Sequence, residues 1–240
     1  MLNLIMDENN KLREEAIKKV IDKIRDRFSI GDYEIIEELR TYNTLEKVIN
    51  QLYERLADWI SIYKKVESKN QIAFVKRVIE ELNSDSDFIL KPSNEEKENI
   101  IEVGNEILRL NELREQLENK IIENVKKLMP NTSYIIDPIV AASLLERAGS
   151  FEKLANLPAS TIQLLGAEKA LFKHIKFKTK SPKHGVLFKE KEISTASKKE
   201  RGRLARMFAN KISIALRADF YTKRFIGDKL KKDLEERIKK

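Results

Sequence analysis

The chain has 240 residues, enough for one large or two modest domains, and 36% of its residues are charged whereas only 7% are aromatic. It contains no cysteine, which excludes disulfides, cysteine-ligated zinc sites and thiol catalysis. No apolar segment has the length of a signal peptide or a membrane span, so we expect an intracellular protein with no membrane partner.

Charge is distributed unevenly along the chain. Residues 161–240 contain 23 Lys and Arg against 9 Asp and Glu, a net charge of +14. Residues 1–160 contain 24 basic and 30 acidic residues, a net charge of −6. Solubility alone gives no reason for this segregation. The pattern predicts a basic module that binds a polyanion and a second module for assembly; a merely lysine-rich surface is the alternative.

The N-terminal part of the chain has the pattern of long amphipathic helices. Residues 11–28 predict a short helix that ends before Gly31, and we assign residues 1–31 to this N-terminal segment. Apolar residues then recur at steps of three or four that average about 3.5, the spacing of a coiled-coil seam. The positions of this first seam are Ile35, Leu39, Tyr42, Leu45, Ile49, Leu52, Leu56, Trp59, Tyr63 and Val66.

A second seam with the same spacing follows. A shorter helix is expected around residues 72–82, and after a polar break Ser93 or Asn94 can cap the next long helix. Gly104 lies inside that helix, where it costs up to ~1 kcal/mol for no reason visible in the sequence. We predict that residues 32–129 form a long antiparallel coiled coil, with an ordinary helical bundle as the alternative. The second seam is Ile100, Val103, Ile107, Leu110, Leu113, Leu117, Ile121, Val125 and Leu128.

Residues 130–240 predict a compact helical domain of shorter elements, so the expected fold class is all-α. Asp137 and Pro138 are a typical N-cap and first helical residue, and Gly149 follows the end of that helix. Ser150 can open the next helix. A long helix is expected over residues 197–225, and a last one from residue 227. The basic stretch KHGVLFKEKEI, residues 183–193, precedes the long helix and has a small β-hairpin as its alternative.

The motifs of common enzymes are missing. The sequence contains no phosphate-binding glycine loop, no dinucleotide fingerprint, no zinc-protease motif and no nucleophile elbow. Its two histidines, His174 and His184, have no acidic partner at a metal-ligand spacing. Carboxylates on the long helices alternate with Lys and Arg, as on a solvated coiled-coil face. We therefore expect neither catalysis nor a cofactor or metal ion.

Three features of the basic domain occur together. The segment GAEK at residues 166–169 ends one helix and begins another, which places Lys169 and Lys173 on one face. The turn SPKHG at residues 181–185 presents Lys183 and His184. Basic residues also crowd the first turns of the helix near residue 200, where they oppose the helix dipole. A phosphate backbone would supply the missing countercharge.

These segments resemble a known family. The runs LLGAEKALFKHI, SPKHGVLF and RGRLARMFANKISIALRADFY are similar to the Nop domain of the archaeal box C/D ribonucleoprotein core protein, whose relatives include nucleolar proteins and a spliceosomal factor. The segment YEIIEELRTYNTLEKVINQLYERLADW resembles the first coiled-coil helix of that family. The resemblance covers residues 32–240, and it identifies residues 130–240 as the Nop domain.

The resemblance implies a function. Such a domain recognises a kink-turn RNA together with its small kink-turn-binding protein, and the coiled coil forms a homodimer that organises a guide particle for RNA 2′-O-methylation. The expected protein contacts are Gly166, Ala167, Glu168 and Lys169. The expected RNA contacts are Lys169, Lys173, Lys176, Lys178, Lys183, His184, Lys198, Lys199, Arg201, Arg203 and Arg206.

Two alternatives remain open at this point. One is a stand-alone Nop-domain factor, similar to the splicing factor, that recruits no methyltransferase; the other is a general polyanion-binding assembly protein. Family members that guide methylation carry a further N-terminal domain that binds fibrillarin, so fibrillarin is an expected partner only of a protein that has this domain. The resemblance implies a cytoplasmic location in archaea and a nuclear or nucleolar one in eukaryotes.

Overall fold

The computed structural model describes residues 13–24, 28, 30–65, 70–84 and 90–238, and all regular structure in these ranges is helical. The predicted all-α fold is confirmed. Residues 13–24 are helical, as expected. The ends of the helix predicted over residues 11–28, the seam position Val66 and part of the break before Ser93 lie outside the described residues.

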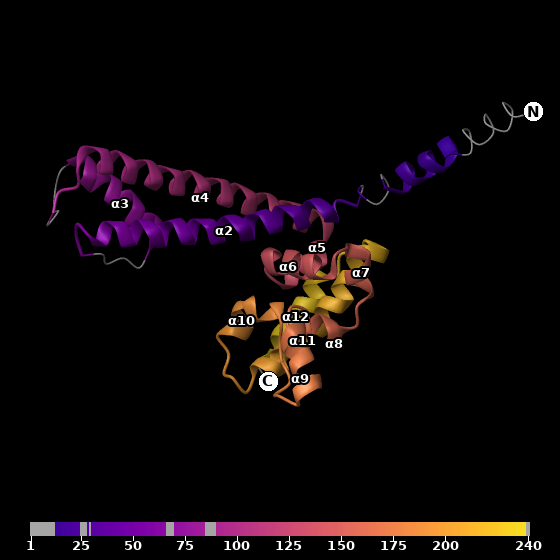
Figure 1. The fold of residues 1–240 in the computed structure, drawn as a ribbon. Coiled ribbons are helices and arrows are strands. Elements are labelled where there is room, and N and C mark those ends of the chain that lie inside the picture. The colour runs from indigo at the N-terminus through magenta and orange to yellow at the C-terminus, as the bar shows by residue number, and fades with distance from the viewer. Residues whose placement is uncertain (1–12, 25–27, 29, 66–69, 85–89, 239–240) are drawn as a thin grey trace, which may run out of the picture. The chain divides into compact units, whose positions relative to one another are not determined.

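Two compact units make up the chain. Residues 38–123 form one unit, and residues 1–37 together with 124–240 form the other. The first unit holds most of α2 (Asp32–Ser61), all of α3 (Gln71–Ser84) and most of α4 (Asn94–Leu128). In this unit α2 and α4 run side by side in opposite directions (Figure 1). The predicted antiparallel pair of long helices is therefore present.

The core of the first unit is built from three helices. Leu56 and Ile60 of α2 and Ile100 and Ile107 of α4 are almost fully buried in one cluster. Helix α3 adds four further buried side chains to the same cluster. At the start of α4, Ser93 and Glu96 form the predicted cap, since the Ser93 hydroxyl accepts from the Glu96 amide and the Glu96 carboxylate accepts from the Ser93 amide.

Gly104 has a packing reason that the sequence did not reveal. A Cβ atom at this position would lie 3.0 Å from Cδ1 and 3.1 Å from Cγ1 of Ile79, and 3.5 Å from Cγ1 of Val75. Both neighbours belong to α3. Glycine therefore lets α3 pack closely against α4, which offsets its cost within a helix.

The second unit is a bundle of short helices around α11. Helices α8 and α11 make the most extensive contact in the described part of the unit, and α5, α7 and α12 also pack on α11. The elements are α5 (Pro130–Ile135), α6 (Pro138–Ala148), α7 (Phe151–Asn156), α8 (Ala159–Leu164), α9 (Glu168–Phe177), η1 (Val186–Lys189), α10 (Lys191–Ser194), α11 (Arg201–Arg217), η2 (Ala218–Thr222) and α12 (Gly227–Ile238).

The predicted caps of this unit are confirmed. The Asp137 side chain accepts from the Ile139 amide at the start of α6, and Gly149 ends that helix with a φ of 79°. The Ser150 hydroxyl accepts from the Lys153 amide at the start of α7. These local signals mark the element boundaries because each satisfies backbone groups that the helix itself leaves free.

Two expectations about the basic half differ from the structure. The long helix predicted over residues 197–225 begins only at Arg201, and its regular part ends at Arg217. A π-helical turn, η2, follows and ends at Lys223, whose φ is 54°. The stretch considered for a β-hairpin instead forms a 3₁₀ helix and a short α-helix, η1 and α10.

The buried carboxylate of Asp219 explains why α11 ends early. Asp219 is 1% exposed, and its two oxygens accept from the backbone and side chain of both Asn131 and Thr132 at 2.7–2.9 Å. Asn131 in turn donates to the Arg224 carbonyl and accepts from the Ile226 amide. The π turn aims Asp219 at the first residues of α5, whose amides need acceptors.

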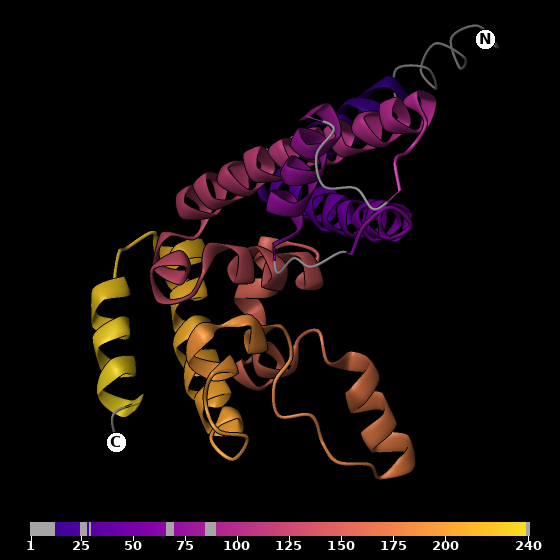
Figure 2. The same ribbon diagram turned by 90° about the vertical axis from the view of Figure 1, so that its left-hand side faces the viewer.

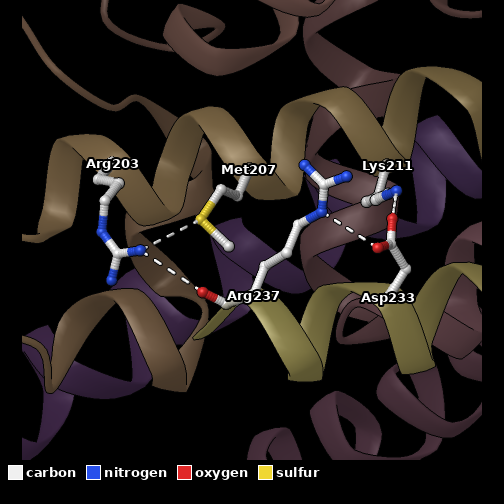
Figure 3. A network of polar contacts seen from close by, with 5 residues as sticks. All are labelled: Arg203, Met207, Lys211, Asp233 and Arg237. Atoms are coloured by element: carbon white, nitrogen blue, oxygen red, sulfur yellow. Dashed lines mark hydrogen bonds and ion pairs between the residues drawn. The ribbon is translucent and has the colours of Figure 1, made fainter. Parts of the chain in front are cut away.

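An ion pair between Lys211 and Asp233 joins α12 to α11 (Figure 3). Lys211 of α11 contacts Asp233 of α12, and Asp233 also accepts from Arg237 at 3.1 Å. The hydrogen bond from Lys211, followed by that from Arg237, lowers the pKa of Asp233. The carboxylate is therefore ionised at neutral pH and stabilises the last helix of the domain.

Within the described ranges, the helices are all too short or too polar to cross a membrane. Among the same residues, no three acidic or histidine side chains gather in a way that could hold a metal ion.

Candidate nucleic-acid interface

Hydrogen bonds hold the GAEK and PKHG segments next to each other. The Gly185 amide donates to the Gln163 carbonyl at 3.0 Å, and the Val186 amide donates to the Leu165 carbonyl at 2.8 Å. The Gln163 side chain donates to the Lys183 carbonyl at 2.7 Å. Because two of these bonds join backbone groups and the third reinforces them, the two turns hold a fixed position relative to each other.

Glycine is required where the turns meet. A Cβ atom on Gly185 would lie 2.0 Å from the Leu165 carbonyl oxygen, closer than any real contact. Gly166 has a φ of 89°, a conformation that L side chains rarely adopt, and its Cβ would lie 2.7 Å from Cγ2 of Val186. Gly166 and Gly185 therefore allow the backbones of the two turns to lie in direct contact, and a larger residue in either motif would push the turns apart.

Glu168 serves the turn itself. Its Oε1 accepts from the Gly166 amide at 2.6 Å, which closes the loop between α8 and α9. From the sequence, Glu168 was expected as a protein contact, and its hydrogen bond with the Gly166 amide was not predicted. A Glu168→Lys variant would disturb the turn directly, so it does not report on a protein partner alone.

Helix α9 stands apart from the other helices of its unit (Figure 2). None of its residues is buried. Lys169, Lys173 and Lys176 are exposed on it. Phe172 and Ile175 are 63% and 71% exposed, which is unusual for apolar side chains in a folded domain. The helix therefore presents both cations and apolar surface to solvent.

The PKHG turn ends in a stack of rings. The His184 ring lies on the Phe188 ring with a centroid distance of 4.7 Å and an interplanar angle of 16°. The Arg201 guanidinium lies 5.1 Å from the Phe188 centroid. Burial, and then the charge of Arg201, lowers the pKa of His184. At neutral pH His184 is thus an uncharged hydrogen-bonding group.

Arg201 holds this loop from within. Its Nε donates to the Ala196 carbonyl at 3.0 Å, and its Nη2 donates to the Ser194 carbonyl at 3.2 Å. The side chain is partly buried in this position. These contacts tie the segment before α11 to the first turn of that helix, so the guanidinium has a structural role in addition to any phosphate contact.

A basic groove lies beside the two turns. It has a volume of about 630 Å³, and Gln163 and Gly202 are among its lining residues. A Cβ on Gly202 would lie 3.0 Å from Cδ of Lys183, so glycine leaves room for the lysine stem across α11. The positive charge of the groove suits a phosphate backbone. Its cations are Lys180, Lys183, Lys199, Arg203 and Arg206.

Arg203 divides its contacts between the groove and the fold. Its Nε donates to Glu200 at 2.6 Å, and its Nη1 contacts the Arg237 carbonyl at 3.5 Å and the Met207 sulfur at 3.8 Å (Figure 3). One of its nitrogens, Nη1, is therefore used in the contact between α11 and α12.

The structure brings together some of the predicted residues and separates others. Lys183, Lys199, Arg203 and Arg206 share the groove, which also contains Lys180, a residue that the sequence analysis missed. Lys180 directly precedes the SPKHG turn, and this position could have predicted that it lies beside Lys183 in the groove. The predicted residues outside the groove lining are Lys169, Lys173, Lys176 and Lys178 on and after α9, His184, Lys198 and Arg201.

Comparisons with known proteins show similarity to one protein family. A family model, Nop, described as "snoRNA binding domain, fibrillarin", matches residues 10–240. Nucleolar protein 56 of Schizosaccharomyces pombe is 28% identical over 251 residues, which cover 90% of this chain and 50% of that protein. A NOP5 family protein of Methanocaldococcus jannaschii is 32% identical over 253 residues, which cover 93% of this chain and 60% of that protein.

A solved structure is also similar. The match is to a chain of the crystal structure of a fibrillarin/Nop5p complex, with a TM-score of 0.58 and 28% sequence identity, over 96% of this chain and 78% of that one. This chain spans about half the length of the curated relatives. Since the family model matches nearly the whole sequence, the chain belongs to the Nop family.

Proposed function

We propose that this chain is an RNA-binding scaffold without catalytic activity, which recognises a kink-turn RNA together with its kink-turn-binding protein. The main support is the junction of the two glycine turns, because it lies beside a groove with five cations. Rigid backbone turns suit recognition of a protein–RNA surface by shape, and the groove suits the adjacent phosphates. Residues 130–240 are the proposed recognition module.

We further propose that the particle is of the box C/D type, which guides RNA 2′-O-methylation. The names of the relatives support this class, since they include nucleolar proteins and a protein crystallised with fibrillarin. Fibrillarin is a proposed partner only of a protein with a further N-terminal domain. The proposed location is the nucleolus in a eukaryote and the cytoplasm in an archaeon.

Charge reversal at Lys183 tests the groove. Lys183→Glu should weaken binding to protein-bound kink-turn RNA by about 1–3 kcal/mol, because Lys183 lies in the groove and no acidic partner engages it among the described residues. The control is Lys229→Glu, an equal charge change at an exposed residue of α12. Lys183→Ala should also lower the salt slope of binding by about one. Arg201 is unsuitable here, since its guanidinium holds the loop.

The same assay separates the alternatives. The proposed scaffold binds kink-turn RNA more tightly when the kink-turn protein is present. Equal affinity for naked kink-turn RNA, the protein-bound RNA and duplex DNA would identify a general polyanion binder instead. Binding of fibrillarin by the full protein would distinguish a methylation particle from a stand-alone factor similar to the splicing protein.

We propose that residues 32–129 mediate a homodimer. Val48 and Leu113, both in the middle of the long helices, remain 36% and 45% exposed, so one intramolecular helix pair leaves apolar surface uncovered. Light scattering should give twice the 28.0 kDa monomer mass. Leu113→Glu should produce a monomer, whereas Leu90→Glu, at an exposed apolar residue outside the seams, should not. A wild-type monomer at high concentration contradicts the dimer but not the fold.

A further inference from the structure

A second hollow lies outside the basic groove, on the part of the domain formed by α5, the start of α6 and α10. Its volume is about 490 Å³. Ile139 and Val140 contribute aliphatic side chains to its wall, and Tyr134 contributes an aromatic ring that is 42% exposed. The hollow is thus large enough for a small planar group and has apolar surface to contact it.

Glu190 places a buried acceptor in this hollow. The residue is 5% exposed, and its Oε1 accepts from the Asp137 amide at 2.8 Å. Among the described residues, Oε2 has no hydrogen-bond partner. This oxygen retains some solvent-exposed surface. Oε2 is therefore open to the hollow. An ionised carboxylate oxygen accepts two hydrogen bonds, so this atom has unused capacity.

The electrostatics of Glu190 favour a donor at this point. Burial raises the pKa of Glu190 to about 7, with smaller contributions from the nearby carboxylates of Glu192 and Asp137, against the opposing effect of the Asp137 amide. The single hydrogen bond from the Asp137 amide does not compensate the charged form for its burial. A ligand that donates two hydrogen bonds would supply them.

The rim of the hollow carries both cations and carboxylates. Lys189, Lys191 and Lys231 line it together with Asp137 and Glu192, and all five residues are exposed. The Lys231 ammonium lies 5.0 Å from the centroid of the Tyr134 ring. An arginine of a partner protein would satisfy Glu190, but it would leave the three ammonium groups without an anionic group of the ligand to contact. A nucleotide matches every part, since its phosphate is anionic, its base faces are apolar and its base edge can donate.

We propose that this hollow binds one unpaired guanine nucleotide of a bound RNA, with the guanine N1–H and 2-amino group donating to Glu190. Guanine is the base whose Watson–Crick edge presents two adjacent donors; adenine, cytosine and uracil each place an acceptor beside the donor. The lysine rim contacts the flanking phosphates. This inference rests on the proposed RNA-binding function and adds a base-specific site to it.

Short labelled oligonucleotides test the proposal with the full chain. Fluorescence anisotropy would compare an oligouridylate that has one central guanosine with the same strand carrying adenosine or inosine at that position. The guanosine strand should bind about tenfold more tightly than the adenosine strand, the scale of a good bidentate base contact. Inosine, which lacks the 2-amino group, should fall between them.

Glu190→Gln removes the preference without removing the fold. The glutamine carbonyl can still accept from the Asp137 amide, while its amino group faces the two guanine donors. The folded-state pKa of Glu190 is raised, so its contribution to stability is present at low pH and is lost as pH rises through about 7. The variant should therefore melt no lower than the wild type at pH 8, and circular dichroism can verify this.

Two matched variants complete the experiment. Glu192→Gln, at the exposed rim, should keep the guanosine preference, and Lys191→Ala should weaken both strands equally. Equal wild-type affinity for guanosine and adenosine strands, or an unchanged preference in Glu190→Gln, overturns the guanine site. If the wild type still assembles with protein-bound kink-turn RNA in that case, the proposed function survives. If it binds neither RNA, both proposals fail.

Discussion

Asp219→Ala should destabilise the helical domain by about 3–5 kcal/mol. The carboxylate is 1% exposed and accepts four hydrogen bonds, two each from Asn131 and Thr132. Alanine would leave those four donors buried without an acceptor, and each unsatisfied donor costs roughly 1–3 kcal/mol before the structure relaxes. Urea unfolding followed by circular dichroism measures the loss.

The effect should scale with the number of acceptors that remain. Asp219→Asn keeps one oxygen and should fall between the wild type and Asp219→Ala. The control is Asp58→Ala, the same substitution at an exposed carboxylate whose pairing with Arg55 is solvated, and it should change stability by less than about 0.5 kcal/mol. A loss below about 1 kcal/mol for Asp219→Ala would show that water replaces the carboxylate and that the network is not a principal support.

Gly185→Ala should separate the two turns and abolish binding to protein-bound kink-turn RNA. The added methyl group would lie 2.0 Å from the Leu165 carbonyl oxygen, so the backbones must move apart. The hydrogen bonds from Gly185 to Gln163 and from Val186 to Leu165 would break. Overpacking and the two lost bonds together cost about 3 kcal/mol of stability, and binding should fall by at least about 100-fold.

Gly149→Ala is the matched control for this substitution. Gly149 also has a positive φ, 79°, but a Cβ there meets nothing within 4 Å. Its variant should lose about 1 kcal/mol of stability through backbone strain and should bind RNA normally. Calorimetric titration with the protein-bound RNA distinguishes the two. Normal binding by a folded Gly185→Ala variant would mean that the junction of the turns is not the recognition surface.

Signals that act within a few residues were sufficient to predict much of the fold. The seam spacing predicted the two long helices, and Ser93, Asp137 and Gly149 marked helix ends through bonds to residues close in sequence. The end of α11 could not be predicted in this way. It depends on Asp219 reaching Asn131, 88 residues away, and no local pattern contains that contact.

The candidate site was predictable in composition more than in geometry. Basic residues near the two turns indicated a polyanion surface, and four of them do share the groove with Lys180. The hydrogen bonds from Arg201 to backbone carbonyls could not be predicted, because Ser194 and Ala196 become its partners only after the loop folds. Gly104 was similarly unexplained until α3 supplied Ile79 as its neighbour.

Helix α9 has a thermodynamic consequence for assembly. It has ten residues and no buried side chain, and isolated helices shorter than about 12–15 residues are marginal in water. The rest of the domain therefore adds little to its helical stability. A partner that covers Phe172 and Ile175 would bury apolar surface and order the helix in the same event. Complex formation should then carry a large negative heat-capacity change, with an entropic cost that the rigid turns beside it do not share.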